Sequence, residues 1–295
     1  MKLNGINGPS LQGVRLSYTE SKTDGIQGSE SRVTLEELKL ERYGPCLLVS
    51  LSCPENLNAF SLRMGQEIIH TFYECERDGD IKSIILTGEG RAFCSGGNIK
   101  DMERAAQDRK GEFLKEIAGK LNRVVTAMRR VPKIVIAAVN GVASGAGFSL
   151  ALASDLIVAA DNARFNLAHR NVGLHPDGGA VYFLEHTIGV YKTRELVYRG
   201  SVLDAVTAEK LNIVNRVVTP EELKQEALAL GRELSEGPNI AMGLAKRTID
   251  LGLNENLDAH LENERQAIAR TGETQDHIEG LRAFSERRRP MFKGR

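Results

Sequence analysis

The sequence predicts an α/β protein with a mainly parallel sheet, followed by a helical C-terminal region. Three observations support this. Strand-like and helix-like segments alternate through most of the chain. The wholly apolar run Ile134–Val139 is typical of a strand buried on both faces of a parallel sheet. Beyond residue 178 the apolar spacing is helical almost throughout, which places the α/β core before a helical tail.

The elements of the first half follow in order. Residues 1–33 are rich in Gly and Ser, and we expect them to form a flexible arm. Apolar positions in residues 35–40 lead through a Gly-Pro pair into the segment CLLVSLS, which predicts a strand hairpin. Residues 64–75 carry apolar side chains at helical spacing behind Ser61, which suits an N-cap. The strand IKSIILTG then leads into a glycine-rich loop that runs through Gly97.

The second half repeats this order before it turns helical. Apolar positions from Phe113 to Met128 predict a helix. The strand 134–139 runs into a second glycine-rich loop, SGAG, before another apolar helix and the strand DLIVAA. Helices with glycine stops and one short strand, IVNRVV, complete the pattern. We therefore divide the chain into an arm, a core at 34–236 and a helical region at 237–295, without internal repeats.

Composition excludes several classes of function. Lys plus Arg and Asp plus Glu balance at 39 each, so no net field directs the chain to nucleic acid or an anionic membrane. The four cysteines lack CxxC spacing and a histidine cluster, which argues against a metal site and a disulfide framework. No apolar run approaches the roughly 18 residues of a membrane span, and the first ten residues have no signal-peptide core. We expect a cytoplasmic protein with neither nucleic-acid nor membrane partners.

Two glycine-rich segments, AFCSGGN and NGVASGAGF, are candidates for an anion-binding site. Each follows a buried strand and opens a helix, where backbone amides are free to bind a negative oxygen. A single loop of this kind more often makes only a tight turn, but two together favour paired donors. The segment GAGFSL is weakly similar to a dinucleotide fingerprint, yet it lacks the third glycine. Nucleotide binding is therefore the weaker alternative.

The segments GEGRAFCSGGNIKDM and AAVNGVASGAGFSLALASDLIVAADNARFNLAHRNVGLHPDGGA resemble the two signature regions of the crotonase, or enoyl-CoA hydratase/isomerase, family. The resemblance extends from about Leu35 through CPENLNAFS to FSERRRPMFKGR. It implies a crotonase-like spiral of ββα turns with C-terminal helices that build homotrimers, often paired into homohexamers. It also implies an acyl-CoA substrate, with coenzyme A as part of the substrate and no metal or redox cofactor.

The resemblance assigns an oxyanion hole to the backbone amides of Gly97 and Ala146. Ala146 replaces the middle residue of a Gly-Gly-Gly run, so it must keep a negative φ for its amide to stay aligned. Two fixed amides would stabilise an enolate or tetrahedral oxyanion by several kcal/mol. Phe292 and Lys293 of a partner subunit are implied to help bind the nucleotide. The implied substrate-binding residues are Asn58, Ala59, Gly97, Asn98, Ile99, Lys100, Ala146 and Ser149.

Hydratases of the family hold a water molecule between two glutamates, because hydration needs two proton transfers. Here the corresponding positions carry Ser149 and His169. An unassisted hydroxyl cannot act as a base near neutral pH, whereas an imidazole with an unperturbed pKa of about 6.5 can. Asp177 matches a catalytic aspartate of the family's dienoyl-CoA isomerases and chlorobenzoyl-CoA dehalogenases. We expect His169 to shuttle a proton and Asp177 to act as a second acid/base or to orient the histidine.

The expected reaction is double-bond isomerisation or a related enolate-forming step. Enoyl-CoA hydration is the first alternative, C–C bond hydrolysis of the β-diketone type the second, and non-catalytic acyl-CoA binding the third. His169 could instead bond a local backbone carbonyl, and Asp177 could cap the helix that follows PDGG. Glu112 and Glu116 fit a solvated helix face, and Cys94 fits a small buried side chain.

Overall fold

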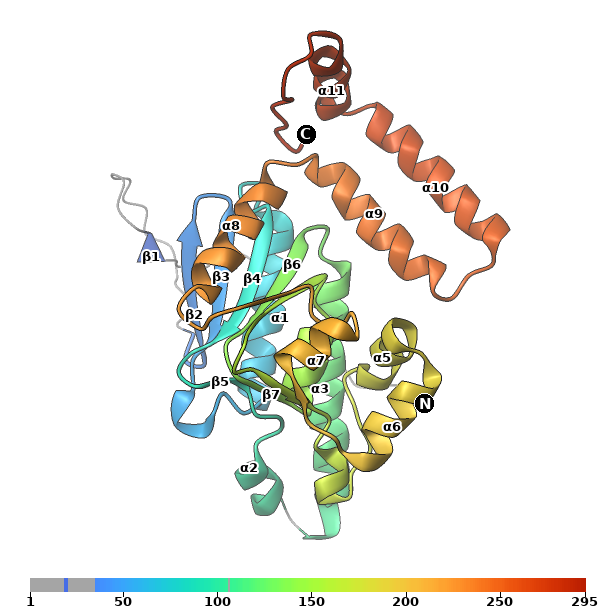
Figure 1. The fold of residues 1–295 in the computed structure, drawn as a ribbon. Helices are drawn as coiled ribbons and strands as arrows, with labels where there is room; N and C mark the ends of the chain where they lie inside the picture. Colours follow the sequence, from blue (N-terminus) through green and yellow to red (C-terminus); the bar gives the residue numbers. More distant parts are fainter. Residues whose placement is uncertain (1–18, 21–34, 106) are drawn as a thin grey trace, which may run out of the picture.

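The computed structural model describes residues 19–20, 35–105 and 107–295. The predicted flexible arm lies outside the described residues apart from Thr19–Glu20, which form β1 and pair in parallel with β2. The rest of the chain forms an α/β core from which the last three helices project to one side (Figure 1). Within the described ranges, no helix is long and apolar enough to cross a membrane.

The larger sheet has seven strands in the order β1-β2-β3-β4-β6-β8-β11. β2 and β3 form the predicted antiparallel hairpin, and all the other neighbours in this sheet are parallel. Its remaining strands are β2 (Leu38–Tyr43), β3 (Cys46–Leu51), β4 (Ser83–Gly88), β6 (Ile134–Val139), β8 (Leu156–Ala160) and β11 (Arg216–Val218). The apolar run that predicted a buried strand is β6, with the predicted bounds.

Both faces of this sheet are covered by helices, which explains why its strands are almost wholly apolar. Along β6, Val135, Ala137 and Val139 face the core beneath α1 and α3, whereas Ile136 and Ala138 face a second core beneath α8. Figure 1 shows α8 in front of the sheet and α1 and α3 behind it. The core helices are α1 (Leu62–Arg77), α2 (Ile99–Arg104), α3 (Lys110–Arg130), α4 (Ala146–Leu152), α5 (Ala180–Ile188), α6 (Val190–Arg199), α7 (Ala205–Lys210) and α8 (Leu223–Ser235).

The predicted N-cap of α1 is confirmed. The Ser61 hydroxyl accepts the Met64 amide at 2.9 Å, a bond that typically stabilises a helix by about 1 kcal/mol. The face of α1 that carries Met64, Ile68, Phe72 and Cys75 is fully buried. The local cap and the helical spacing thus fix both the start and the orientation of this helix.

A second sheet of four short strands, in the order β10-β9-β7-β5, was not expected from the residues alone. The strands are β5 (Ala92–Cys94), β7 (Val142–Ser144), β9 (Arg164–Asn166) and β10 (Leu203–Asp204). β5 and β7 lie in the segments predicted as glycine-rich loops, since three residues are too few for an alternating pattern. Each turn of the chain adds one strand to each sheet, as β4–β5, β6–β7 and β8–β9. This is the ββα spiral that the family resemblance implied, and it places the two glycine-rich segments side by side.

Buried charges fix α9 (Asn239–Gly252) to the core. The Lys246 ammonium is 2.8 Å from the Asp155 carboxylate and also donates to two main-chain carbonyls. Burial lowers the pKa of Lys246, and the neighbouring Asp155 opposes that shift. Arg129 bridges Asp155 and Asp250 at 2.8 and 2.6 Å. α10 (Leu257–Gly272) and α11 (Gln275–Ser285) follow and complete the helical region.

Candidate active site

The first glycine-rich loop is held by Phe60. The Phe60 amide donates to the Gly96 carbonyl at 2.7 Å, and the Asn98 amide donates to the Phe60 carbonyl at 3.2 Å. Asn98 then caps α2 through its side chain. The Gly97 amide, which lies between these bonded groups, has no hydrogen-bond partner among the described residues. It is therefore free to bind a ligand oxygen.

The second loop opens α4. Gly145 takes a left-handed φ of 51°, and Ala146 is the first residue of the helix, without a positive φ. The requirement that Ala146 keep a negative φ is met because the glycine before it makes the turn. The Gly145 amide donates to the Asn166 carbonyl at 3.0 Å, while the Ala146 amide has no acceptor in the described part of the chain.

The two loops are in direct contact, and glycines make this contact feasible. A Cβ atom on Gly96 would lie 3.2 Å from the Ser144 carbonyl oxygen. A Cβ atom on Gly147 would lie only 2.1 Å from the Cys94 carbonyl oxygen. Gly97 and Ala146 consequently line the same cavity, whose volume is about 1030 Å³. The two free amides therefore border one cavity, and their pairing as donors to one oxygen stays a prediction.

The wall of this cavity combines basic and apolar side chains. Arg91, Lys100 and Lys115 are exposed cations, and Leu121 and Leu174 are among the aliphatic residues. Such a wall suits a ligand with both an anionic and an apolar part. Sequence reasoning missed Lys115 and Leu121 because a predicted helix does not reveal which face meets a cavity. The predicted residues in the wall are Ala59, Gly97, Asn98, Ile99, Lys100, Ala146, His169 and Asp177.

His169 and Asp177 form a pair against the second loop. The His169 Nε2 atom is 3.3 Å from Asp177 Oδ1, and the two side chains are 11 % and 33 % exposed. The His169 Cε1 atom lies 3.7 Å from the point that a Cβ of Gly145 would occupy. The His169 Nδ1 atom is buried and lacks a hydrogen-bond partner within the described residues. The structure thus places an imidazole–carboxylate pair beside the amide of Ala146.

The alternative roles of these two residues do not fit the geometry. Gly179, not Asp177, is the N-cap of α5, and no side chain among the described residues bonds this helix start. Among the described residues the His169 ring bonds the Asp177 carboxylate and no backbone carbonyl. His175, by contrast, is exposed and contacts the Pro176 carbonyl at 2.6 Å.

Two predicted substrate-binding residues lie outside the cavity wall. Asn58 is fully buried, with its side-chain oxygen accepting the Cys53 amide at 2.9 Å and its side-chain nitrogen donating to the Ala92 carbonyl at 2.8 Å. Its polar atoms therefore hold the turn that presents Ala59. Ser149 is also fully buried, and its hydroxyl donates to the Asp177 carbonyl at 2.9 Å. Both side chains form hydrogen bonds in the protein interior, which sequence spacing alone could not reveal.

The remaining candidates occupy less reactive positions. Glu112 and Glu116 are exposed on α3 and do not line the cavity. Burial raises the pKa of Cys94 to about 11, so its thiol is protonated at neutral pH. Phe292 and Lys293 are not in the wall of this cavity within the same chain. No group of three or more potential metal-ligating side chains occurs among the described residues.

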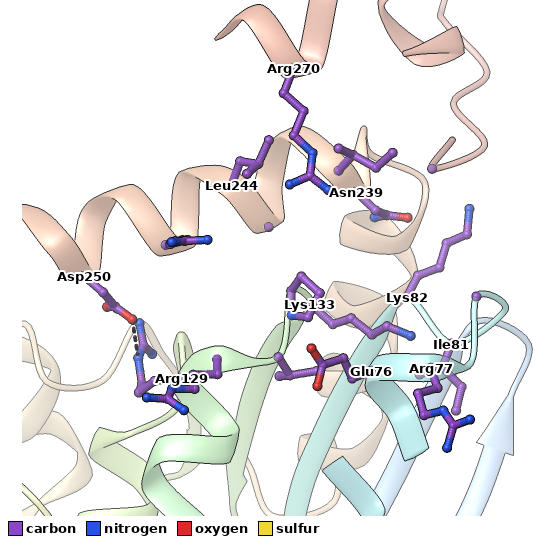
Figure 2. Close-up of a pocket in the computed structure, with 18 of the residues that line it drawn as sticks. Glu76, Arg77, Ile81, Lys82, Arg129, Lys133, Asn239, Leu244, Asp250 and Arg270 are labelled. Atoms are coloured by element: carbon purple, nitrogen blue, oxygen red, sulfur yellow. Dashed lines mark hydrogen bonds and ion pairs between the residues drawn. The ribbon is translucent and has the colours of Figure 1, made fainter. Parts of the chain in front are cut away.

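A second cavity, of about 890 Å³, lies between α9 and the ends of α1 and α3 (Figure 2). Figure 2 shows Arg270 reaching toward it from α10, with Lys82 and Lys133 on the core side. The Arg129–Asp250 ion pair described above lies in its wall. None of the predicted catalytic residues lines this cavity. Residues of the two glycine-rich loops and the imidazole–carboxylate pair line the first cavity.

Comparison with known proteins gives a consistent picture. The sequence model of the Enoyl-CoA hydratase/isomerase family matches residues 41–295. The chain is 34 % identical to 1,2-epoxyphenylacetyl-CoA isomerase of Escherichia coli over 249 residues, 84 % of this chain and 95 % of that protein. It is 30 % identical to trans-2-decenoyl-[acyl-carrier-protein] isomerase of Streptococcus mutans over 251 residues, 84 % and 94 % of the two chains. The crystal structure of an enoyl-CoA hydratase from Bacillus anthracis aligns with a TM-score of 0.84 at 29 % identity, covering 88 % of this chain and all of that one. The chain is therefore an enzyme of the enoyl-CoA hydratase/isomerase family, with the fold of the crotonase superfamily.

Proposed function

We propose that this enzyme shifts a double bond in an acyl-CoA thioester through an enolate intermediate. The observation that carries the proposal is the His169–Asp177 pair, which lies against the oxyanion loop in one cavity. The pair supplies a base, and the free amides of Gly97 and Ala146 supply donors for the charge that forms. One relative, named trans-2-decenoyl-[acyl-carrier-protein] isomerase, supports this choice of reaction.

The proposed reaction is a single proton shuttle. The amides of Gly97 and Ala146 bind the thioester carbonyl oxygen, and His169 removes a proton from the saturated carbon at the α position, or at the γ position when the double bond lies between α and β. The electron pair left behind moves onto the oxygen, where the two amides stabilise it without reorganising. The imidazolium then returns the proton at the other end of the conjugated system, so the double bond moves and no atoms are gained or lost. No metal, redox cofactor or second substrate enters this scheme.

Asp177 is proposed to orient His169 and to stabilise its protonated form. The Asp177 carboxylate lies 3.3 Å from His169 Nε2, and its negative charge stabilises the imidazolium that forms when the ring takes a proton. The Nδ1 atom is buried, so we propose that the proton is transferred at Nε2, beside the carboxylate that lines the cavity.

Hydration of an enoyl-CoA is the alternative that the site supports less well. Adding water needs one group to activate the water and another to protonate the substrate carbon. The Ser149 hydroxyl is already donated to the Asp177 carbonyl, so one of the two expected positions holds no available proton carrier. We expect slow hydration of crotonyl-CoA. Hydrolysis of a C–C bond, the third candidate, likewise needs an activated water.

The test is a panel of acyl-CoA substrates analysed by mass spectrometry, followed by variants assayed on the substrate found. His169→Ala and Asp177→Asn should each lower turnover by about 10² or more, the usual scale for general acid–base groups, with little change in ligand affinity or Tm. His175→Ala is the matched control, because His175 lines the same cavity but bonds only a main-chain carbonyl. Full activity of Asp177→Asn, or hydration of crotonyl-CoA near the diffusional ceiling of about 10⁸ M⁻¹s⁻¹, would refute the proposed chemistry.

We further propose that α9, α10 and α11 assemble the chain into a homotrimer or homohexamer. These helices expose large apolar side chains, including Ile249, Leu257, Ile268 and Phe284. Isolated apolar side chains are common on surfaces, but such a series along successive helices favours a protein partner. Light scattering at micromolar concentration should give three or six times the chain mass. A stable monomer would contradict this assembly and the nucleotide-binding role expected for a partner's Phe292 and Lys293.

A further inference from the structure

Ser149 connects the two halves of the site. It lies in α4 and is fully buried. Its hydroxyl is 2.9 Å from the Asp177 carbonyl oxygen and 3.2 Å from the Gly145 carbonyl oxygen. Gly145 directly precedes the oxyanion amide of Ala146, and Asp177 carries the carboxylate that contacts His169. One buried hydroxyl therefore contacts the main chain of both the oxyanion loop and the acidic loop.

The acidic loop is packed tightly onto this serine. Gly178 has a left-handed φ of 60°, and a Cβ atom placed on it would lie 2.8 Å from the Ser149 Cβ. The same point would also lie 2.7 Å from Leu121 Cδ2. The main chain at Gly178 is thus enclosed between α3 and α4. A side chain larger than serine at position 149 would displace the loop that presents Asp177.

We propose that Ser149 is a positioning residue, which sets the Asp177 carboxylate, and through it the His169 ring, relative to the oxyanion amides. The inference rests on the proposed function of the His169–Asp177 pair. It gives position 149 a structural role in the place where hydratases of the family carry a glutamate. Ser149 does not line the cavity, so it acts through Asp177 rather than on the substrate.

The fold itself should tolerate loss of this hydroxyl. The Asp177 carbonyl also accepts the Ala180 amide at 3.2 Å, and the Gly145 carbonyl also accepts the Ser149 amide at 3.0 Å. Neither buried carbonyl is left without a partner in Ser149→Ala, and a buried carbonyl that keeps one bond avoids most of the desolvation cost. The variant should therefore affect the placement of the acidic loop more than the stability of the protein.

The test compares Ser149→Ala with Ser154→Ala. Ser154 is a matched control, because it is a buried serine of the same segment whose hydroxyl reaches only the Leu150 carbonyl, at 3.3 Å. In Ser149→Ala we expect kcat to fall about tenfold with KM within about twofold, as for an interaction made only in the transition state. Amide hydrogen exchange at residues 177–180 should accelerate, with Tm within about 4 °C of the wild type. Ser154→Ala should leave kcat and this exchange unchanged.

A double variant separates positioning from general stability. If Ser149 acts through Asp177, then Ser149→Ala combined with Asp177→Asn should be no slower than Asp177→Asn alone. Additive losses would overturn the inference, as would unchanged exchange at residues 177–180 in Ser149→Ala. The exchange measurement needs no substrate, so it decides the role of Ser149 even if the panel reveals no turnover. Absence of turnover in the wild-type enzyme would instead refute the proposed function.

Discussion

Gly147→Ala tests the contact between the two glycine-rich loops. Gly147 is the second residue of α4, and an added Cβ would lie 2.1 Å from the Cys94 carbonyl oxygen and 2.8 Å from the Cys94 Cβ. The nearest of these atoms belongs to the main chain of β5, so no side-chain rotation can relieve it. The loops would have to separate by about 1 Å, a displacement that can cost about 10² in rate when it misplaces catalytic groups.

The same displacement should also lower the thermal stability of the protein. Overpacking of a buried site typically costs about 1–3 kcal/mol. For a domain of this size each kcal/mol lowers Tm by about 2–4 °C, so a cost of about 2 kcal/mol corresponds to a decrease of about 4–8 °C. Turnover should fall by about 10² because the Ala146 amide moves relative to that of Gly97, whereas the ligand still enters the cavity.

Gly119→Ala is the matched control for this experiment. Gly119 lies within α3, and a Cβ there would have no neighbour within 4 Å in the described part of the chain apart from its own helix backbone. Alanine is favoured over glycine inside a helix by about 1 kcal/mol, so this variant should keep full turnover and gain a few degrees in Tm. Both variants are assayed by calorimetry and by turnover of the substrate found in the panel. If Gly147→Ala keeps the wild-type Tm and turnover, the described contact between the loops is wrong. If only Tm falls, the contact is real but the amides do not contribute to catalysis.

Two further predictions concern buried groups outside the site. Lys246→Met should lower the free energy of unfolding by about 1.5–3 kcal/mol in urea denaturation, because it removes a buried charged donor that bonds Asp155 and two main-chain carbonyls, while Asp155 keeps its ion pair with Arg129. Lys224→Met removes a largely exposed ion pair, so it should lower the free energy of unfolding by no more than about 1 kcal/mol. If the two variants lose the same stability, the greater importance of the buried lysine is wrong. Burial raises the pKa of Cys94 to about 11 and that of Cys75 to about 12, from an ordinary value of 9.0. Above about pH 9 the unfolded chain loses thiol protons that the folded protein keeps, so stability should fall as pH rises, and iodoacetamide at pH 8 should modify these thiols only after unfolding.

The sequence was sufficient to predict the longer helices and strands, because the patterns that specify them are local. The run Ile134–Val139 predicted the central strand with its bounds, and Ser61 predicted the start of α1. Helical spacing likewise located α3. The short strands β5, β7 and β9 were not predicted from the residues, since their pairing with distant segments, rather than their own pattern, makes them strands.

The sequence by itself also determined which chemical groups are available: two glycine-rich helix starts, Ser149 and His169 at the positions where related hydratases carry glutamates, and Asp177 eight residues further along. Only the tertiary structure decided where these groups point. Asp177 could have capped α5, but left-handed Gly178 and Gly179 turn the chain so that its carboxylate meets His169. Ser149 could have faced the substrate, but its hydroxyl bonds a carbonyl 28 residues later in the chain. Spacing along a chain specifies which residues share an element, whereas the direction of a side chain depends on contacts with residues that only folding brings near.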